Sequence, residues 1–368
     1  MSRPFERISD VVRIGLERHR RGFFSQAEDI YLEVLDSSPS HPEALYFLGV
    51  LALQADRPDL AVDRLCRARM IDDRAGGAFQ EHLGLAWQAL GRPAEAEACF
   101  RDALARQPES ARSFAGLCAA VGGQGRWHEV DRLLAAHGCP VPVRFRVPGS
   151  GRAVVALTID DGPTADTTPR LLEALARFRA TATFCLVGHR AERHPELVRA
   201  MVAAGHEVAA HGFSHRSFPD LDAAAIAEEL ETTEALLRTI RSTPCLYPVR
   251  LPFGQGWADP RVHAAVRAWS ARAFFAHWTF DLKDWAISAR HMDREAAAEA
   301  IDLAVGRLLA SPDLDRAVVL LHDRPIDNPS PHAGWVSVTM LERLLAALTG
   351  QGYAIRSLSA AAHADEVH

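Results

Sequence analysis

The sequence predicts two successive parts: an all-α solenoid, and an α/β part whose strands close into a distorted (β/α) barrel of about seven strands. Three observations carry this prediction. Residues 1–138 have a helical pattern throughout, which repeats about every 34 residues. Residues 139–152 contain three Pro and two Gly, which interrupt helices and indicate a linker. In residues 153–368, short β-branched apolar runs alternate with helical patterns, as they do in parallel α/β sheets.

The helical repeat keeps several sequence positions in register. One set consists of small residues, spaced 34, 35 and 34 apart: Ala27, Ala61, Ala96 and Val130. A second set, with the same spacing, consists of larger apolar residues: Tyr31, Leu65, Phe100 and Leu134. Small residues let two helices approach closely. Stacked helix pairs bury the apolar surface that a single pair leaves exposed. This pattern resembles the tetratricopeptide repeat, over about the first third of the chain.

The repeats and the composition indicate which classes of molecule this protein binds. The resemblance to tetratricopeptide repeats implies a concave groove for a peptide or a partner protein. Two alternatives stay open: the repeats pack against the second domain, or they mediate self-association. The chain has 41 Lys and Arg against 47 Asp and Glu, and a formal net charge of −6. Because no basic run stands out, we expect no nucleic acid partner.

The sequence also predicts where the protein is located. No apolar run approaches the roughly 20 residues that a transmembrane helix needs. The N-terminal residues continue as a polar amphipathic segment, without the apolar stretch of a secretory signal. None of the six Cys belongs to a Cys-x-x-Cys pair, so we expect reduced, buried thiols. These features together predict a cytoplasmic protein.

The α/β part is expected to contain seven strands with helices between most of them. The apolar, β-branched runs cover residues 153–159, 181–187, 207–210, 246–249, 274–280, 317–321 and 353–357. The helical patterns cover, for example, residues 168–179, 195–204, 222–240, 293–310 and 338–350. Polar residues cluster just after many of the strand ends. We therefore expect a barrel, since a barrel gathers the ends of its strands at one mouth.

Five short polar motifs follow five of these strands. They are Asp160-Asp161-Gly162-Pro163, His211-Gly212-Phe213-Ser214-His215, Arg250-Leu251-Pro252-Phe253-Gly254, Asp281-Leu282-Lys283-Asp284-Trp285 and Leu320-Leu321-His322-Asp323. Each motif taken singly has a structural explanation, such as a turn, a helix cap, an ion pair or a core histidine. If the second motif is helical, its i, i+4 spacing puts both imidazoles on one face. Two imidazoles and a carboxylate then make a metal site that leaves room for water.

The five motifs in this order resemble those of the polysaccharide deacetylases, the NodB-homology domains of carbohydrate esterase family 4. The resemblance covers about residues 150–358 and implies that one divalent metal ion is held by Asp161, His211 and His215. Zn²⁺ suits this ligand set best, and Co²⁺, Ni²⁺ or Fe²⁺ also fit it. Two positions depart from the commonest family pattern: Ile159 replaces a Phe, and Gly212 replaces a frequent Ser or Thr. Neither position supplies a ligand atom, so a change in packing or in outer hydrogen bonds is expected.

The same resemblance implies the catalytic roles. Asp160 is expected to be the general base, with Arg250 as its orienting partner. His322 is expected to be the general acid, and Asp284 to tune its protonation. Two further groups are expected to contact the substrate: the backbone N–H of Phe253, as an oxyanion donor, and the side chain of Trp285, in the sugar groove.

The expected function is therefore a metal-dependent hydrolase that removes N-acetyl groups from an N-acetylated sugar polymer, oligosaccharide or glycan precursor. Two alternatives remain. The same site would serve an O-acetyl esterase or a hydrolase of non-sugar amides. The chain could also be an inactive scaffold that uses its repeats to bind protein. A scaffold is the weaker alternative, because every expected ligand and acid/base position is filled.

Overall fold

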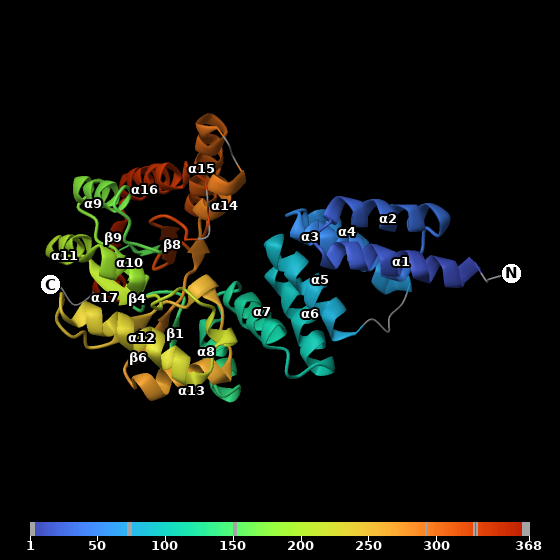
Figure 1. The fold of residues 1–368 in the computed structure, drawn as a ribbon, viewed down its shortest axis with the longest axis horizontal. Coiled ribbons are helices and arrows are strands. Elements are labelled where there is room, and N and C mark those ends of the chain that lie inside the picture. Colours follow the sequence, from blue (N-terminus) through green and yellow to red (C-terminus); the bar gives the residue numbers. More distant parts are fainter. Residues whose placement is uncertain are drawn as a thin grey trace. The chain divides into compact units, whose positions relative to one another are not determined.

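The computed structural model describes residues 4–71, 76–149, 153–290, 293–326, 328 and 330–362, and side chains from residue 10 onward. The chain divides into two compact units, Met1–Leu134 and Ala135–His368. We call them the helical unit and the α/β unit (Figure 1). The last three residues of the expected linker, 150–152, lie outside the described residues.

The helical unit consists of helices that pair with their neighbours along the chain. They are α1 (Pro4–Arg20), α2 (Phe24–Ser37), α3 (Pro42–Gln54), α4 (Pro58–Ile71), α5 (Gly77–Ala89), α6 (Pro93–Arg106) and α7 (Ala111–Gly122), followed by α8 (Trp127–Ala136), which runs past the end of the unit. Both sets of repeated positions are buried. A Cβ built on Gly84 would lie 2.9 Å from Phe100, so this helix pair needs a glycine for its close approach. The predicted repeat architecture is confirmed.

The α/β unit is built on one parallel sheet. Its strands are β1 (Val143–Arg144), β2 (Val154–Asp160), β3 (Thr183–Leu186), β4 (Glu207–Ala210), β5 (Tyr247–Val249), β6 (Ala273–Ala276), β7 (Phe280–Asp281), β8 (Val318–His322) and β9 (Ala354–Arg356). Their order is β1-β6-β5-β4-β3-β2-β8-β7, and β9 pairs with the first half of β2. All of these strand pairs are parallel, as the alternation of strands and helices predicts.

The expected strand at 274–280 is in fact two strands: β6, next to the edge strand β1, and β7, at the opposite edge of the sheet. His277 N donates to Arg144 O in β1 (3.0 Å), and Thr279 N donates to Val318 O in β8 (2.8 Å). Two residues span at most about 7 Å, so the two edges must lie side by side. The sheet is therefore curled into the distorted barrel that the sequence predicts. Strand β1 lies within the expected linker, because its backbone extends the edge of β6.

Helices surround the curled sheet (Figure 1). They are α9 (Thr168–Arg177), α10 (Gly188–Arg193), α11 (Pro195–Ala203), α12 (Ala223–Arg238), α13 (Pro260–Trp269), α14 (Asp284–Arg290), α15 (Arg294–Leu309), α16 (Ala333–Gly350) and α17 (Leu358–Ala362), with short 3₁₀ turns η1 (Phe218–Asp220) and η2 (Pro252–Gly254). Within the described ranges, no helix has both the length and the apolar character of a bilayer span.

Strand β2 is buried along its whole length and positions part of the site. Its side chains alternate between two faces, as in any strand. One face packs into the main apolar core through Val155, Leu157 and Ile159. The other face places Thr158 and Asp160 inside the barrel, where Arg250 reaches both of them.

Candidate active site

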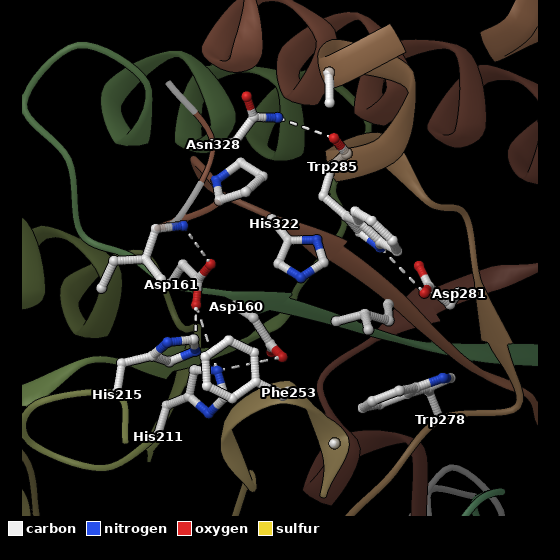
Figure 2. Close-up of a pocket in the computed structure, with 15 residues that line it drawn as sticks. Asp160, Asp161, His211, His215, Phe253, Trp278, Asp281, Trp285, His322 and Asn328 are labelled. Atoms are coloured by element: carbon white, nitrogen blue, oxygen red, sulfur yellow. Dashed lines mark hydrogen bonds and ion pairs between the residues drawn. The ribbon is translucent and has the colours of Figure 1, made fainter. Parts of the chain in front are cut away.

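The polar residues predicted from the sequence meet at the carboxyl ends of the parallel strands. Asp160 ends β2, His211 follows β4, Arg250 follows β5 and His322 ends β8. A pocket of about 560 Å³ opens at this edge, and Figure 2 shows the side chains that line it. The predicted residues in its lining are Asp160, Asp161, His211, His215, Phe253, Trp285 and His322. Arg250 and Asp284 lie behind it and contact Asp160 and His322, respectively.

The three predicted metal ligands lie together. The Nε2 atoms of His211 and His215 lie 3.4 and 3.2 Å from Asp161 Oδ1. All three side chains are buried, and their candidate ligand atoms lie within 4.8 Å of one another. Donor atoms around a tetrahedral Zn²⁺, each about 2.1 Å from the metal, lie about 3.4 Å apart. The spacing of these three residues is therefore that of a small divalent ion.

The hydrogen bonds around these ligands favour a cation. His211 Nδ1 lies 3.0 Å from Arg250 O, which can only accept, so Nδ1 donates to this carbonyl and Nε2 is the nitrogen that faces Asp161. Asp161 Oδ2 accepts from Ile326 N (2.9 Å), whereas its buried Oδ1 has no hydrogen-bond partner among the described residues. Burial alone would raise the pKa of Asp161, but the imidazoles of His211 and His215 hold it well below its usual range. An ionised oxygen and imidazole nitrogens thus converge on one point, as metal ligands do.

The backbone brings the two histidines together without a helix. Residues 211–215 form an irregular turn, so the conditional expectation of a helix here is wrong. Gly212 and His215 have positive φ angles of 72° and 59°, outside the range of an α-helix. The left-handed residues turn the chain back on itself. The imidazole centroids consequently lie 4.9 Å apart, although the side chains do not share a helix face.

Asp160 has different surroundings from Asp161. Its Oδ2 accepts from Arg250 Nη1 (3.1 Å), and Arg250 Nη2 donates to Thr158 Oγ1 (2.9 Å). The guanidinium also lies over the Trp278 ring, 5.0 Å from its centroid. These contacts fix the orientation of the Asp160 carboxylate. Its Oδ1 is buried and has no hydrogen-bond partner in the described part of the chain, so it can accept a proton from a molecule in the pocket.

His322 and Asp284 form a second charged pair. Asp284 Oδ2 accepts from His322 N (2.9 Å), and Asp284 Oδ1 lies 2.7 Å from His322 Nδ1. Burial disfavours the imidazolium, but the Asp284 carboxylate outweighs burial and raises the pKa of His322 to about 10. Asp161 and Asp160 add to this effect, so a divalent cation beside them would lower the pKa again. The Nδ1 contact leaves Nε2 to face the pocket.

Phe253 and Trp285 belong to the pocket wall. Phe253 has φ 58° and ψ 9°, and its side chain is 52 % exposed. Gly254 continues the turn with φ 64°, and a Cβ there would lie 2.2 Å from the Trp278 ring. Only glycine fits this position, and the turn carries the backbone of residues 253–254 along the pocket. Trp285 is half-exposed, and its Nε1 donates to Asp281 Oδ2 (3.3 Å).

Sequence reasoning assigned no role to several residues of the pocket: Trp278, Asp281, Leu320, Ile326 and Asn328. Two signals could have found some of them. Leu320 lies two residues before His322 in β8, so strand alternation places both on one face. Asp281 is the first residue of the Asp-x-x-Asp-Trp motif. The Ile326 N–H carries no side-chain signal, because a backbone donor can belong to any residue type.

Comparisons with known proteins identify relatives of both parts of the chain. The family model described as polysaccharide deacetylase matches residues 148–273, and the tetratricopeptide repeat model matches residues 12–75 and 82–125. A chitooligosaccharide deacetylase of Sinorhizobium fredii is 35% identical over 217 residues, which are 57% of this chain and 92% of the relative. A peptidoglycan-N-acetylglucosamine deacetylase of Bacillus cereus is 27% identical over 217 residues, 59% of this chain and 91% of the relative.

Among solved structures, the peptidoglycan deacetylase PdaC from Bacillus subtilis superposes with a TM-score of 0.47 at 23% identity. That similarity covers 59% of this chain and 93% of PdaC. The family assignment rests on the sequence relatives, of which the Sinorhizobium protein is matched over almost its whole length. The chain therefore belongs to the polysaccharide deacetylase family, and its deacetylase domain is preceded by tetratricopeptide repeats.

Proposed function

We propose that this protein is a metal-dependent hydrolase that removes N-acetyl groups from an N-acetylated sugar polymer, oligosaccharide or glycan precursor. The observation that carries the proposal is the Asp161 carboxylate, whose buried Oδ1 faces two histidine nitrogens and has no hydrogen-bond partner in the described chain. The names of the relatives support the substrate class, since they act on chitooligosaccharides and on peptidoglycan N-acetylglucosamine.

Asp161, His211 and His215 would hold the metal ion. Their two nitrogens and one oxygen suit Zn²⁺ best, and Co²⁺, Ni²⁺ or Fe²⁺ also suit them. When bound, the ion supplies Lewis acidity toward a carbonyl oxygen and a water molecule. The Ile326 N–H and the Arg250 carbonyl hold the outer atoms of Asp161 and His211, and so aim the ligand atoms inward.

Asp160 acts as the general base. Arg250 occupies its Oδ2, which leaves the buried Oδ1 to take a proton from the attacking water. Because Thr158 and Trp278 hold the guanidinium in turn, the base keeps one orientation during the reaction. The water, once deprotonated, attacks the carbonyl carbon of the acetamido group.

Phe253 and His322 act on the two other atoms of the amide. The N–H of Phe253 donates to the carbonyl oxygen as negative charge develops on it. His322 donates a proton to the nitrogen, because an amine is too basic to leave without one. Asp284 keeps the imidazole protonated until that step. Asp160 and His322 thus act as base and acid, and each is oriented by its own partner, Arg250 and Asp284, respectively.

Trp285 offers an aromatic face to a sugar ring at the edge of the pocket, and the helical repeats offer a surface to a protein partner or to a second copy of this chain. The hydrogen bond from Trp285 Nε1 to Asp281 orients the indole ring in the pocket wall.

The test combines metal analysis with product detection. The purified protein is analysed for bound metal and then incubated with N-acetylated chito-oligosaccharides and with an O-acetylated polysaccharide. We expect about one divalent ion per chain, and acetate from the N-acetylated substrate. Acetate from the O-acetylated substrate alone would replace the proposal with an esterase. Protein that binds no metal and releases no acetate from either substrate would favour the inactive scaffold.

A further inference from the structure

The turn that carries the two metal-binding histidines needs an external support. We call residues Gly212, Phe213 and Ser214 the histidine turn, since they connect His211 to His215. The turn is not helical, so its backbone N–H and C=O groups have no partners within a regular element. The residue at position 212 is a glycine and brings no side chain to hold the turn together. Neighbouring elements must therefore satisfy these groups.

The carbonyl groups and the N–H groups of the histidine turn are bound by different helices. On the α10 side, Gly188 N donates to Gly212 O (2.9 Å) and His189 N donates to Phe213 O (3.0 Å). These two bonds use the carbonyl groups of Gly212 and Phe213. The donors, the N–H groups of residues 213 and 214, are bound by a different helix, α12. A single residue of α12 receives both of them.

That residue is Glu229. Its Oε2 accepts from Phe213 N (2.7 Å) and from Ser214 N (2.8 Å), and its Oε1 accepts from Ser214 Oγ. Glu229 is 9 % exposed, so these bonds are largely shielded from water and are of the strong, charge-assisted kind. A Cβ on Gly212, which has φ 72°, would lie 3.1 Å from Glu229 Oε2. A side chain at position 212 would thus crowd the Glu229 carboxylate, whereas glycine leaves room for it.

Glu229 is itself fixed by its helix. Ile226, Leu230 and Leu237 of α12 are buried. Thr233 Oγ1 donates to the Glu229 carbonyl, which ties the same turn of the helix (2.9 Å). The carboxylate is therefore a rigid anchor for the histidine turn. Its position is set by the core of the α/β unit and does not depend on the pocket.

From these contacts we infer that Glu229 is a positioning residue for the metal site: it fixes the histidine turn and thereby the distance between the His211 and His215 nitrogens. The inference rests on the proposed metal-dependent function. Glu229 touches neither the pocket nor the ligand atoms. Its role is to remove the freedom of a glycine-containing turn before the metal binds, which lowers the entropic cost of binding.

The test is the metal affinity of Glu229→Ala, measured by competition with a fluorescent chelator for Zn²⁺. We expect Zn²⁺ to bind about 10–100-fold more weakly than to the wild type, the usual cost of a lost outer partner. Glu229→Gln keeps an oxygen acceptor for both N–H groups and an NH₂ group for Ser214 Oγ, so we expect it to recover most of the affinity. If Glu229→Ala does not fold, Glu229→Asp takes its place. The shorter side chain keeps the negative charge, but its carboxylate lies farther from the N–H groups of the turn.

The matched control is Glu234→Ala in the same helix. Glu234 is 1 % exposed and pairs with Arg241 (2.8 Å), away from the histidine turn. We expect this variant to lose stability, measured by denaturant unfolding with the metal removed, and to keep the wild-type Zn²⁺ affinity. Wild-type affinity in Glu229→Ala, or an equal loss in Glu234→Ala, would overturn the inference. A wild type that binds no Zn²⁺ would instead overturn the proposed function.

Discussion

The buried carboxylates of the helical unit and those of the pocket differ in how completely they are paired. In the helical unit, Glu81 accepts from both Ser110 and Ser113 through Oε2, and Arg112 lies 3.6 Å from its Oε1. Glu97 is likewise paired at both oxygens, by Arg101 on one and by Gln124 and Arg126 on the other. These carboxylates join neighbouring helices.

In the pocket, Asp160 and Asp161 each accept a hydrogen bond at Oδ2 alone, from Arg250 and from the Ile326 N–H, and Asp161 Oδ1 faces the Nε2 atoms of the two histidines. Both Oδ1 atoms are buried without a hydrogen-bond partner in the described residues. An unpaired buried oxygen costs about 1–3 kcal/mol or more, so a fold retains it where a ligand or a reaction compensates. The comparison teaches that burial of charge alone does not mark the site. What distinguishes the pocket is that two neighbouring aspartates there each keep a buried oxygen without a hydrogen bond, whereas Glu234 of α12 keeps one singly, outside the pocket.

The largest expected effect is on turnover. Asp160→Asn removes the proton acceptor and keeps the size of the side chain and an oxygen toward Arg250. We expect acetate release to fall by about 10²–10⁴-fold. Bound metal, determined by elemental analysis, should stay at the wild-type level, because Asp160 is not a predicted ligand. Full activity in this variant would refute the assigned base and would weaken the contrast between site and scaffold.

The next effect is on metal binding. His211→Ala removes a ligand atom, so its Zn²⁺ affinity should fall by more than the about 10–100-fold that loss of an outer partner costs. The control is His206→Gln, which changes another buried histidine of the α/β unit, 7 % exposed, outside the pocket lining. Zn²⁺ titration of both proteins separates them. Equal Zn²⁺ affinities of the two variants would show that His211 is not a metal ligand.

A third change addresses the helical unit. Phe100 is fully buried against the helix that carries Gly84. Phe100→Ala should destabilise this unit by about 3–5 kcal/mol, since it leaves a cavity. Acetate release below the unfolding transition should be unchanged. Met70→Ala, at a position 86 % exposed in α4, serves as the control and should change stability by less than about 0.5 kcal/mol. A proportional loss of activity in Phe100→Ala would show that the two units are functionally coupled.

The smallest effect is a pH dependence outside the site. Burial lowers the pKa of His206 from 6.5 to about 4, so between these pH values the unfolded chain binds more protons than the folded one. The stability therefore decreases as the pH falls through this window, by about 2 kcal/mol between pH 7 and pH 5 for this group. His206→Gln should lose that much less over the same range in denaturant unfolding. An unchanged pH slope would show that His206 is accessible to protons in the folded protein.

Local spacing in the sequence determined a large part of this structure. The positions of Ala27, Ala61 and Ala96 predict the buried helix contacts, because each repeat packs mainly on its neighbours in the chain. The order of strands and helices likewise predicts a curled parallel sheet. Strand-end motifs then select the residues of the pocket, since parallel strands deliver their carboxyl ends to one edge. For these features, residues at regularly spaced sequence positions also occupy equivalent positions in the structure.

The tertiary structure decided what depends on contacts between distant segments or on single backbone angles. The separation of the run at 274–280 into β6 and β7 follows from hydrogen bonds to Arg144 and Val318, which lie far away in the chain. The turn between His211 and His215 depends on left-handed φ angles, and its support by Glu229 joins residues on different elements. Backbone donors such as the Ile326 N–H are common to nearly all residue types. Only the folded chain shows which backbone N–H group contacts an aspartate, because the contact depends on the position of the residue and not on its side chain.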